Sequence, residues 1–312
     1  MISVSYPPVQ HIQILYQRFK EFIAPETDRY YMLKSLLEDL CLNPQVITIS
    51  GNRHLFLSAQ GDFLNEIKAQ WTHTFTILVA HYDRVPNSPG ANDNGAAVFE
   101  LIEAALKLRK EKILRWFIIF TDKEELAHGE GIRDQGSYTL ARGLQDAGLG
   151  NSWFYIFDAC GVGDTLVIST MADHLMKQEA GPGITRTRMR VRQLRAKALE
   201  TTRRLRMERV RLIPTPFSDD AGFLRAGIAA QTITMLPSEE AAAFGDLLRI
   251  NPSFAGALVN KDARDRCDTR LIPLTWRRLN GPEDNDLLLT PQHFPLVVRF
   301  IYALCKGWNA AF

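Results

Sequence analysis

The segment that decides the fold begins with Leu78-Val79-Ala80-His81-Tyr82-Asp83 and continues, after a Pro/Gly-containing loop, with Gly90-Ala91-Asn92-Asp93-Asn94-Gly95-Ala96. A helical pattern follows, and then comes Trp116-Phe117-Ile118-Ile119-Phe120-Thr121-Asp122-Lys123-Glu124-Glu125. Both apolar runs are typical of strands, and each ends abruptly in polar residues that can bind metals. In open α/β sheets, ligands and metals bind beyond the carboxyl ends of the strands. The segment therefore predicts a metal hydrolase.

Beyond this segment, strand-like runs alternate with helical patterns along most of the chain. The expected strands lie at 74–80, 114–121, 153–157, 166–169 and 230–236. Helices are expected at 94–109, at 136–149 and from Pro291 onward. This alternation predicts an α/β fold with a mixed, mostly parallel central sheet and helices on both faces. No linker or repeat divides the chain, so we expect one domain over residues 1–312.

Three further segments flank these core elements. The N-terminal region from about 8 to 42 reads as helical, and residues 46–50 and 54–58 read as a β-hairpin. Residues 185–211 read as a helix very rich in arginine. Residues from about 237 to 274 show little periodicity, and we expect an irregular excursion over the surface there.

The composition is that of an ordinary soluble globular protein. The chain has 312 residues, of which 46% are hydrophobic and 23% charged, with a formal net charge of +2. No secretory signal or membrane-spanning run is visible, and the scattered cysteines form no CxxC pair. Cytoplasmic location with unpaired, mostly buried thiols is therefore the expectation. The cysteines are Cys41, Cys160, Cys267 and Cys305.

The polar residues at the strand ends include several candidate ligands. His81 and Asp83 are two positions apart at a strand end, so their side chains could share one pocket. Imidazole binds zinc well, and a carboxylate behind it can accept its other N–H. Asp93 precedes a helix and could alone be a simple N-cap. Glu124-Glu125 and Asp158 could alone be solvated helix-start and turn residues.

Taken together, these residues favour a metal site over separate caps and turns. Three central strands each place an acid or a histidine at the carboxyl end, and Asp93 lies between two of them. Carboxylates crowded at one edge of a sheet repel each other, and a divalent cation relieves that repulsion. Carboxylate and imidazole together suit zinc. A carboxylate that bridges two ions is usual in two-metal hydrolases.

At these positions the chain resembles the co-catalytic zinc aminopeptidases of metallopeptidase family 28, to which glutaminyl cyclases are related. The resemblance extends from about Leu78 to the C-terminus. It implies the zinc-exopeptidase fold, and it rests on the combination of the following motifs: His81-Tyr82-Asp83, Asn92-Asp93-Asn94-Gly95-Ala96, Glu124-Glu125 with Gly136-Ser137, Asp158, and Ser218-Asp219 before Phe223.

The resemblance also implies roles for these residues. His81 and Asp158 would bind one zinc ion, Glu125 would bind a second, and Asp93 would bridge the two. Asp83 would support His81, and Glu124 would be the general base that accepts a proton from the attacking water. One or two zinc ions per chain are therefore expected.

The last third of the chain departs from the family pattern. The resemblance implies a second histidine ligand there, but the matching stretch, 276–284, has Asn280 at that position. An amide oxygen is a poorer zinc ligand than imidazole, so the second metal site is in doubt. His293 could replace the missing ligand only if its loop folded back. Asp219 could support the site or simply cap a helix.

These observations favour a zinc-dependent aminopeptidase that hydrolyses the N-terminal peptide bond of small peptides. The alternatives are a glutaminyl-cyclase-like aminoacyltransferase with one zinc ion, and a non-catalytic relative that binds peptides or proteins. A nucleic-acid partner for the arginine-rich helix is disfavoured, since the chain is nearly neutral and carries no recognised binding motif. We expect a small peptide as partner and no membrane contact, and the sequence does not indicate the oligomeric state.

Overall fold

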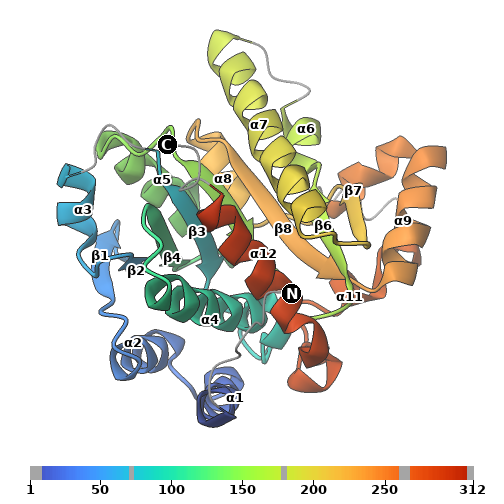
Figure 1. Cartoon of the computed structure of the whole chain (residues 1–312). Helices are drawn as coiled ribbons and strands as arrows, with labels where there is room; N and C mark the ends of the chain where they lie inside the picture. Colours follow the sequence, from blue (N-terminus) through green and yellow to red (C-terminus); the bar gives the residue numbers. More distant parts are fainter. Residues whose placement is uncertain (1–8, 70–73, 177–180, 260–267, 308–312) are drawn as a thin grey trace.

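The computed structural model of the chain describes residues 9–69, 74–176, 181–259 and 268–307. Its centre is one mixed sheet (Figure 1). The strands are β1 Gln45–Ile49, β2 Asn52–Ser58, β3 Thr76–His81, β4 Trp116–Thr121, β5 Trp153–Phe157, β6 Thr165–Ser169, β7 Val210–Ile213 and β8 Ala230–Leu236. Across the sheet their order is β1-β2-β4-β3-β5-β8-β6-β7.

The middle of the sheet is parallel. β3 pairs in parallel with β4 on one side and with β5 on the other, and β5 pairs in parallel with β8. β1 and β2 form an antiparallel hairpin that joins β4, whereas β8 pairs antiparallel with β6. Since β3, β4 and β5 are parallel neighbours, their carboxyl ends meet at one edge of the sheet.

Helices cover both faces of this sheet (Figure 1). The α-helices are α1 Val9–Ile23, α2 Arg29–Asp39, α3 Phe63–Ala69, α4 Ala97–Lys110, α5 Gly136–Asp146, α6 Met171–Leu175, α7 Pro182–Arg204, α8 Asp219–Arg225, α9 Ser238–Ile250, α11 Leu274–Arg277 and α12 Phe294–Lys306. Short helical turns are η1 Ala91–Ala96, η2 Ile132–Asp134, η3 Pro252–Leu258, η4 Thr269–Leu271, η5 Asp286–Leu288 and η6 Pro291–His293.

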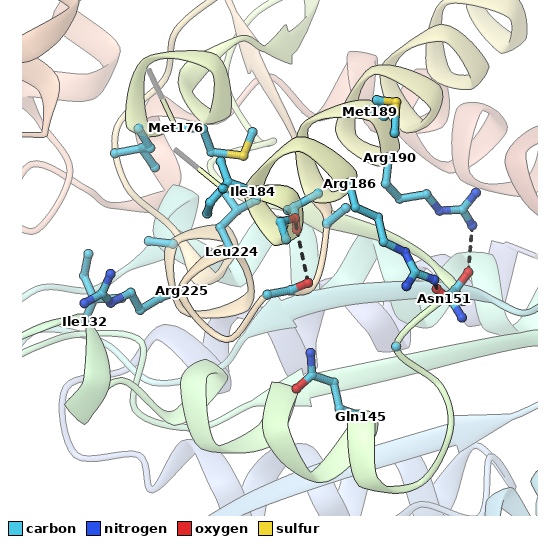
Figure 2. A pocket seen from close by; sticks show the side chains of 18 of the residues that line it. Ile132, Gln145, Asn151, Met176, Ile184, Arg186, Met189, Arg190, Leu224 and Arg225 are labelled. Carbon is cyan, nitrogen blue, oxygen red and sulfur yellow. Dashed lines mark hydrogen bonds between the residues drawn. The ribbon is translucent and has the colours of Figure 1, made fainter. Parts of the chain in front are cut away.

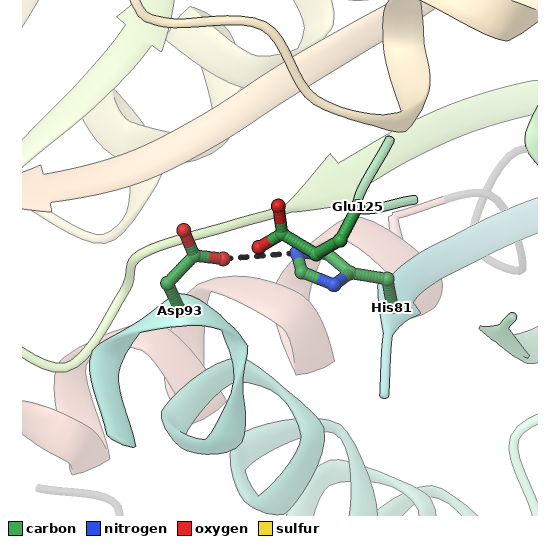
Figure 3. A group of neighbouring side chains, drawn as sticks. All are labelled: His81, Asp93 and Glu125. Atoms are coloured by element: carbon green, nitrogen blue, oxygen red, sulfur yellow. Dashed lines mark ion pairs between the residues drawn. The ribbon is translucent and has the colours of Figure 1, made fainter. Parts of the chain in front are cut away.

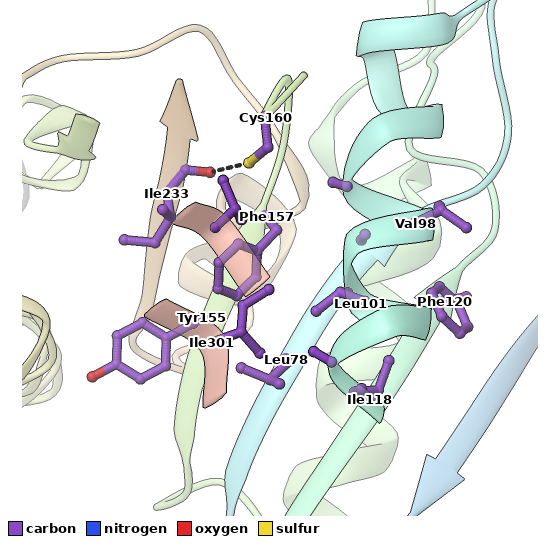
Figure 4. Packing of buried hydrophobic residues seen from close by; sticks show 14 of the residues in the cluster. Leu78, Val98, Leu101, Ile118, Phe120, Tyr155, Phe157, Cys160, Ile233 and Ile301 are labelled. Atoms are coloured by element: carbon purple, nitrogen blue, oxygen red, sulfur yellow. Dashed lines mark hydrogen bonds between the residues drawn. The ribbon is translucent and has the colours of Figure 1, made fainter. Parts of the chain in front are cut away.

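The alternation of side chains along the central strands separates two cores. Leu78 and Ala80 of β3 belong to the cluster shared with α4, α7 and α12, part of which is shown in Figure 4. Ile77 and Val79 belong to the opposite cluster, shared with α3, α5 and α8. Every residue of β3 and β4 is buried, as expected of strands covered on both faces. This packing holds the carboxyl ends of the strands in fixed positions.

The predicted fold class is confirmed. Each expected central strand is present within two residues of the predicted bounds, and the hairpin at β1 and β2 is also present. Helices α1 and α2 occupy the N-terminal region that was expected to be helical. The assignment of the whole chain to one domain stays a prediction.

The expectation of an irregular excursion over residues 237–274 is wrong for its first part. Helix α9 occupies Ser238–Ile250, and the short helix η3 follows it. Glu239 and Glu240 lie in the first turn of α9, where acidic side chains stabilise a helix. Ala241 and Phe244 are buried in a third cluster with Trp276. Burial of the apolar face formed by Ala241 and Phe244 therefore stabilises the helical conformation of residues 238–250.

The arginine-rich helix is shorter than predicted. Helix α7 ends at Arg204, and Val210–Ile213 forms the edge strand β7, which pairs in parallel with β6. The free edge of β6 offers backbone hydrogen bonds to this segment, so tertiary pairing overrides its helical pattern. Residues 206–211 thus lie outside the helix, and the last two of them, Val210 and Arg211, belong to the sheet.

Two further expectations concern the cysteines and membrane contact. Cys160 and Cys305 are buried as expected, whereas Cys41 is exposed. Cys267 lies outside the described residues. Within the described ranges, no helix combines the length and apolar character needed to cross a membrane.

Candidate metal centre

Three neighbouring strands bring the predicted ligands to one edge of the sheet. His81 is the last residue of β3, and Asp158 follows the last residue of β5. Glu124 and Glu125 follow β4 after a short turn, and Asp93 lies in η1, just before α4. The order β4-β3-β5 therefore places residues from distant parts of the chain side by side.

Carboxylates surround the imidazole of His81. Its Nε2 atom lies 3.0 Å from Oδ1 of Asp93, 3.8 Å from Oδ1 of Asp158 and 4.0 Å from Oε2 of Glu124. On the other side of the ring, Nδ1 lies 3.4 Å from Oδ1 of Asp83. The His81 side chain is 1% exposed, so these carboxylates face it in a nearly water-free setting.

Three of these residues could hold one metal ion. His81, Asp93 and Glu125 each offer a ligand atom, and the three atoms lie within 4.8 Å of one another. Figure 3 shows the carboxylates of Asp93 and Glu125 directed toward the His81 ring. Asp158 lies on the same side of that ring, because it also approaches Nε2.

Several polar atoms at this centre are buried without a hydrogen-bond partner among the described residues. They are Nε2 of His81, Oδ1 of Asp93, Oε1 of Glu125 and Oδ1 of Asp158. Although Asp93 is only 3.0 Å from His81, the contact lacks hydrogen-bond geometry. A buried polar atom without a partner costs folding free energy unless a hydrogen bond or a bound ion compensates for it. One imidazole and several carboxylates form a donor set that fits zinc.

The close approach of several buried carboxyl groups to His81 shifts the pKa values of the residues at the centre. Burial lowers the pKa of His81, but the surrounding carboxylates outweigh it and hold that pKa well above its usual value. Burial and the charge of Asp93 raise the pKa of Glu125 to about 9. Burial and the charge of Asp158 likewise raise the pKa of Asp93. Without a cation, the centre therefore retains protons that a bound metal ion would displace.

Asp83 connects His81 to the Glu124-Glu125 pair. Its Oδ1 accepts a hydrogen bond from the backbone N–H of Glu124 at 3.1 Å, and its Oδ2 accepts one from the N–H of Glu125 at 2.9 Å. Burial opposes ionisation of this carboxyl, but His81 and the two N–H donors prevail and lower its pKa. Asp83 thus fixes the turn after β4 while it faces the imidazole.

Glu124 has a different environment from the three clustered residues. Its Oε1 accepts a hydrogen bond from Nε2 of Gln135 at 2.8 Å, and Ser137 in turn donates to Oε1 of Gln135 at 3.0 Å. Burial raises the pKa of Glu124 well above its usual value, and the neighbouring Glu125 adds to this effect. A carboxyl that is held in place and binds protons readily can act as an acid or a base.

Two buried charged residues hold the loop that carries Asp93. Arg29 of α2 donates to the carbonyl oxygens of residues 82, 83, 89 and 90 at 2.6 to 3.2 Å. The carboxylate of Asp284 accepts hydrogen bonds from the N–H groups of Asn92 at 2.8 Å and Asp93 at 3.0 Å. The two ends of the chain therefore fix the loop between His81 and the Asp93 side chain.

The remaining predicted residues lie around the centre. Asn280 is exposed, has a φ of 64° and lines the same cavity as Asp93 and Glu125. His293 is half-buried and is not among the described residues that line this cavity. Asp219 starts α8 and is fully buried, and it accepts a hydrogen bond from the Thr121 hydroxyl at 2.5 Å. Burial raises the pKa of Asp219 to about 6.

A cavity of about 600 Å³ opens onto the centre. Asp93, Glu124, Glu125 and Asp158 form its acidic end. Apolar side chains form much of the remaining wall, and they are Leu126, Ile132, Pro216, Phe217, Leu258, Ile272, Trp276 and Leu279. A small molecule or the end of a peptide fits a space of this size and character.

Gln135 and Arg29 contribute to the centre although neither was predicted from the sequence. Gln135 directly precedes the Gly136-Ser137 pair that was noted, and its buried amide contacts Glu124. An isolated glutamine or arginine has no spacing pattern, so the sequence gives no direct signal for either. Gly90 gives only an indirect indication of the Arg29 contact, because a Cβ atom at position 90 would lie 2.7 Å from the Arg29 guanidinium.

Comparison with solved structures shows the fold. LapA aminopeptidase of Legionella pneumophila has 13% identity and a TM-score of 0.61, covering 99% of this chain and 76% of that chain. Glutaminyl cyclase of Porphyromonas gingivalis has 15% identity and a TM-score of 0.58, covering 95% of this chain and 96% of that chain. The zinc aminopeptidase BSAP of Bacillus subtilis has 16% identity and a TM-score of 0.51, with 82% of this chain covered.

This chain spans about half the length of BSAP, since the match covers 49% of that protein. Comparison with curated proteins gave no significant match. At the level of sequence families, the model of Peptidase family M28 matches residues 64–263. That range is more than half of the chain and includes every predicted ligand except Asn280. The protein therefore belongs to Peptidase family M28.

Proposed function

We propose that this protein is a zinc-dependent aminopeptidase that hydrolyses the N-terminal peptide bond of small peptides. The observation that carries the proposal is the approach of ligand atoms from His81, Asp93 and Glu125 to within 4.8 Å of one another. An adjacent cavity can take the end of a peptide. Membership of a peptidase family supports the same activity.

In this proposal His81, Asp93, Glu125 and Asp158 would hold zinc, and Asp93 would be a ligand of both ions if two are bound. A bound zinc ion would lower the pKa of water to around 7 and polarise the scissile carbonyl. Asp83 faces Nδ1 of His81 and orients the ring, so that Nε2 points toward the ligand carboxylates.

Glu124 is the proposed general base. It would take a proton from the water whose oxygen bonds to the scissile carbonyl carbon, and it would deliver that proton to the amine nitrogen that is released when the C–N bond breaks. The amide of Gln135 donates a hydrogen bond to Oε1 of Glu124, while Oε2 of Glu124 lies 4.0 Å from Nε2 of His81. The raised pKa of Glu124 suits a group that must both accept and release a proton.

The second candidate is a glutaminyl-cyclase-like aminoacyltransferase that uses one zinc ion. Asn280 weakens the second metal site, which cyclisation does not need, although a histidine would also be expected at this position in a glutaminyl cyclase. The match to a glutaminyl cyclase over nearly the full length of both chains supports this candidate as well. Cyclisation needs one metal ion and one carboxyl that works as acid and base, so it tolerates a lost ligand.

Elemental analysis of the purified protein, combined with product analysis, tests the proposal. About two zinc ions per chain and release of the N-terminal amino acid from small peptides support the aminopeptidase. About one zinc ion, with cyclisation of peptides that begin with glutamine, supports the cyclase. Protein that binds no zinc and converts neither substrate would contradict both activities and leave a peptide-binding role.

Asp93→Ala checks the ligand assignment in the same assay. If Asp93 holds zinc, the variant loses most of its metal. If Asp93 is only a helix cap, the variant keeps its full zinc content and loses about 1 kcal/mol of folding free energy. Glu130→Ala is a control, since Glu130 lies outside the cavity and pairs with Lys123.

A further inference from the structure

A second cavity adjoins the one at the metal centre. It has a volume of about 1520 Å³, and both cavities have Ile132 and Ala221 in their walls. Its walls come from η2, the end of α5, the start of α7, and α8. We call this second cavity the arginine groove. Its described charged lining residues are Arg133, Asp134, Arg186, Arg190 and Arg225.

The arginines of α7 differ according to where they lie. Arg195 pairs with Asp173 at 2.6 Å, and Arg204 lies 3.6 Å from a carboxylate oxygen of Glu200. In the groove, the Arg186 guanidinium donates to the neutral amide of Asn151 at 3.3 Å, and to no other side chain among the described residues. Within the described ranges, no carboxylate lies at ion-pair distance from Arg133, Arg186 or Arg190. The groove therefore carries positive charge that its described neighbours leave unneutralised.

Arg190 is held rigidly in the wall of the groove. Its guanidinium lies 3.7 Å from the centroid of the Trp153 ring and donates to the carbonyl of Asn151 at 2.7 Å. Figure 2 shows Arg186 and Arg190 reaching from α7 toward Asn151, with Ile132 and Arg225 at the other end of the view. A positive charge fixed in advance loses little conformational entropy when an anion binds.

The start of α7 adds to the positive potential. This helix has 23 residues, and its first turn contains no acidic residue. The N-terminus of a helix carries partial positive charge, so arginines in the first turns destabilise the helix. Arg186 and Arg190 follow the first turn, at positions 5 and 9 of the helix. An anion in the groove would neutralise both the side chains and the helix end.

We propose that the arginine groove binds the acidic downstream part of a peptide whose N-terminal residue lies at the metal centre. This inference rests on the proposed peptidase function. The acidic end of the first cavity attracts the positive α-amino group, whereas the arginine groove attracts aspartate and glutamate side chains further along. Ile132 and Ala221 line both cavities, so the two spaces adjoin there, and an extended peptide, which advances about 3.3 Å per residue, can run past these two residues from the first cavity into the groove.

A nucleic acid fits this arrangement less well. Its phosphate backbone carries negative charge along its whole length, and the carboxylates of Asp93, Glu124, Glu125 and Asp158 would repel it in the first cavity. A peptide can carry opposite charges at its two ends. The continuity of the cavities therefore favours an acidic peptide.

Paired octapeptide substrates test the proposal. Both begin with the same two residues, and one has aspartate and glutamate from the third position onward where the other has asparagine and glutamine. At low ionic strength we expect kcat/KM to favour the acidic peptide roughly 5- to 30-fold, with the preference falling as salt is added. Arg133→Gln combined with Arg186→Gln should remove most of this preference and leave dipeptide hydrolysis unchanged.

Arg192→Gln is the matched control. Arg192 is exposed on the same helix and lies outside the groove, so the preference should survive this change. Equal kcat/KM for the two octapeptides, or an equal loss of preference in the control, would overturn the proposal. Thermal unfolding of each variant identifies any loss of activity that comes from misfolding.

A binding measurement separates this proposal from the proposed function. Fluorescence anisotropy of a labelled acidic octapeptide on Glu124→Gln needs no turnover, and binding should weaken in the triple variant that also carries Arg133→Gln and Arg186→Gln. If the wild type hydrolyses no peptide but this binding pattern holds, only the proposed hydrolysis fails. If a single-stranded oligonucleotide binds more tightly than the peptide through the same arginines, the acidic-peptide proposal is contradicted.

Discussion

At the scale of single residues, Glu124 and Glu125 are adjacent in sequence but have separate surroundings. Glu125 offers its carboxylate to the group formed with His81 and Asp93. Glu124 is instead anchored by Gln135. The backbone N–H groups of both residues donate to Asp83, so one carboxylate fixes the directions of two others. This division of contacts is why we assign proton transfer to Glu124 and metal binding to Glu125.

Glu124→Gln should lower kcat by at least ~10²-fold and leave the zinc content nearly unchanged, because the base is not a metal ligand. Glutamine keeps the size of the side chain and removes its ability to accept the proton. Steady-state kinetics and elemental analysis of the same preparation check both parts. A variant that kept most of its activity would refute the role given to Glu124.

Arg29 has a different kind of effect, because it acts on backbone carbonyls. Arg29→Met would leave up to four carbonyl oxygens without their donor, and we expect a loss of roughly 3 kcal/mol in the free energy of unfolding. Urea denaturation measures this loss. Arg192→Met, an exposed change on α7, should cost less than ~0.5 kcal/mol. Equal losses in the two variants would mean that the contacts of Arg29 contribute little.

At the scale of elements, strands were easier to predict than the segments that depend on distant partners. β3 and β4 consist almost entirely of apolar residues, and burial on both faces leaves few other conformations for such runs. The segment of β7 instead became a strand because β6 lies beside it. Sequence periodicity carries no information about that neighbour.

The same distinction applies to the candidate site. His81, Asp93, Glu124 and Asp158 could be identified because each directly follows, or lies between, strong structural signals. Arg29 and Asp284 act on the Asp93 loop from opposite ends of the chain. Their partners are backbone groups, which are the same for every residue type. No sequence pattern could therefore indicate these two contacts.

At the scale of the whole molecule, the buried acids make the stability of the metal-free protein depend on pH. Burial raises the folded-state pKa of Glu125 to about 9, against an ordinary value of 4.5. Between these values the folded chain keeps a proton that the unfolded chain has lost. The raised pKa of His81 acts in the same direction above pH 6.5. The folded state thus binds more protons, so stability decreases as the pH rises.

We therefore expect chelator-treated protein to become less stable between pH 6.5 and 9, as measured by urea denaturation. The lowered pKa of His54, about 4, affects stability only below this window. Zinc-loaded protein should show a weaker dependence, because the metal ion replaces the retained protons. A metal-free protein whose stability increased with pH over this range would contradict the described protonation of the centre.

The most direct test of the account is anomalous X-ray diffraction at the zinc absorption edge on crystals of the zinc-loaded protein. We expect a peak within bonding distance of His81, Asp93 and Glu125, with Asp158 as a further ligand and the Glu124 carboxylate not coordinated. A map without a peak at this edge of the sheet, or with zinc bound only elsewhere, would contradict the claim that these side chains share a cation.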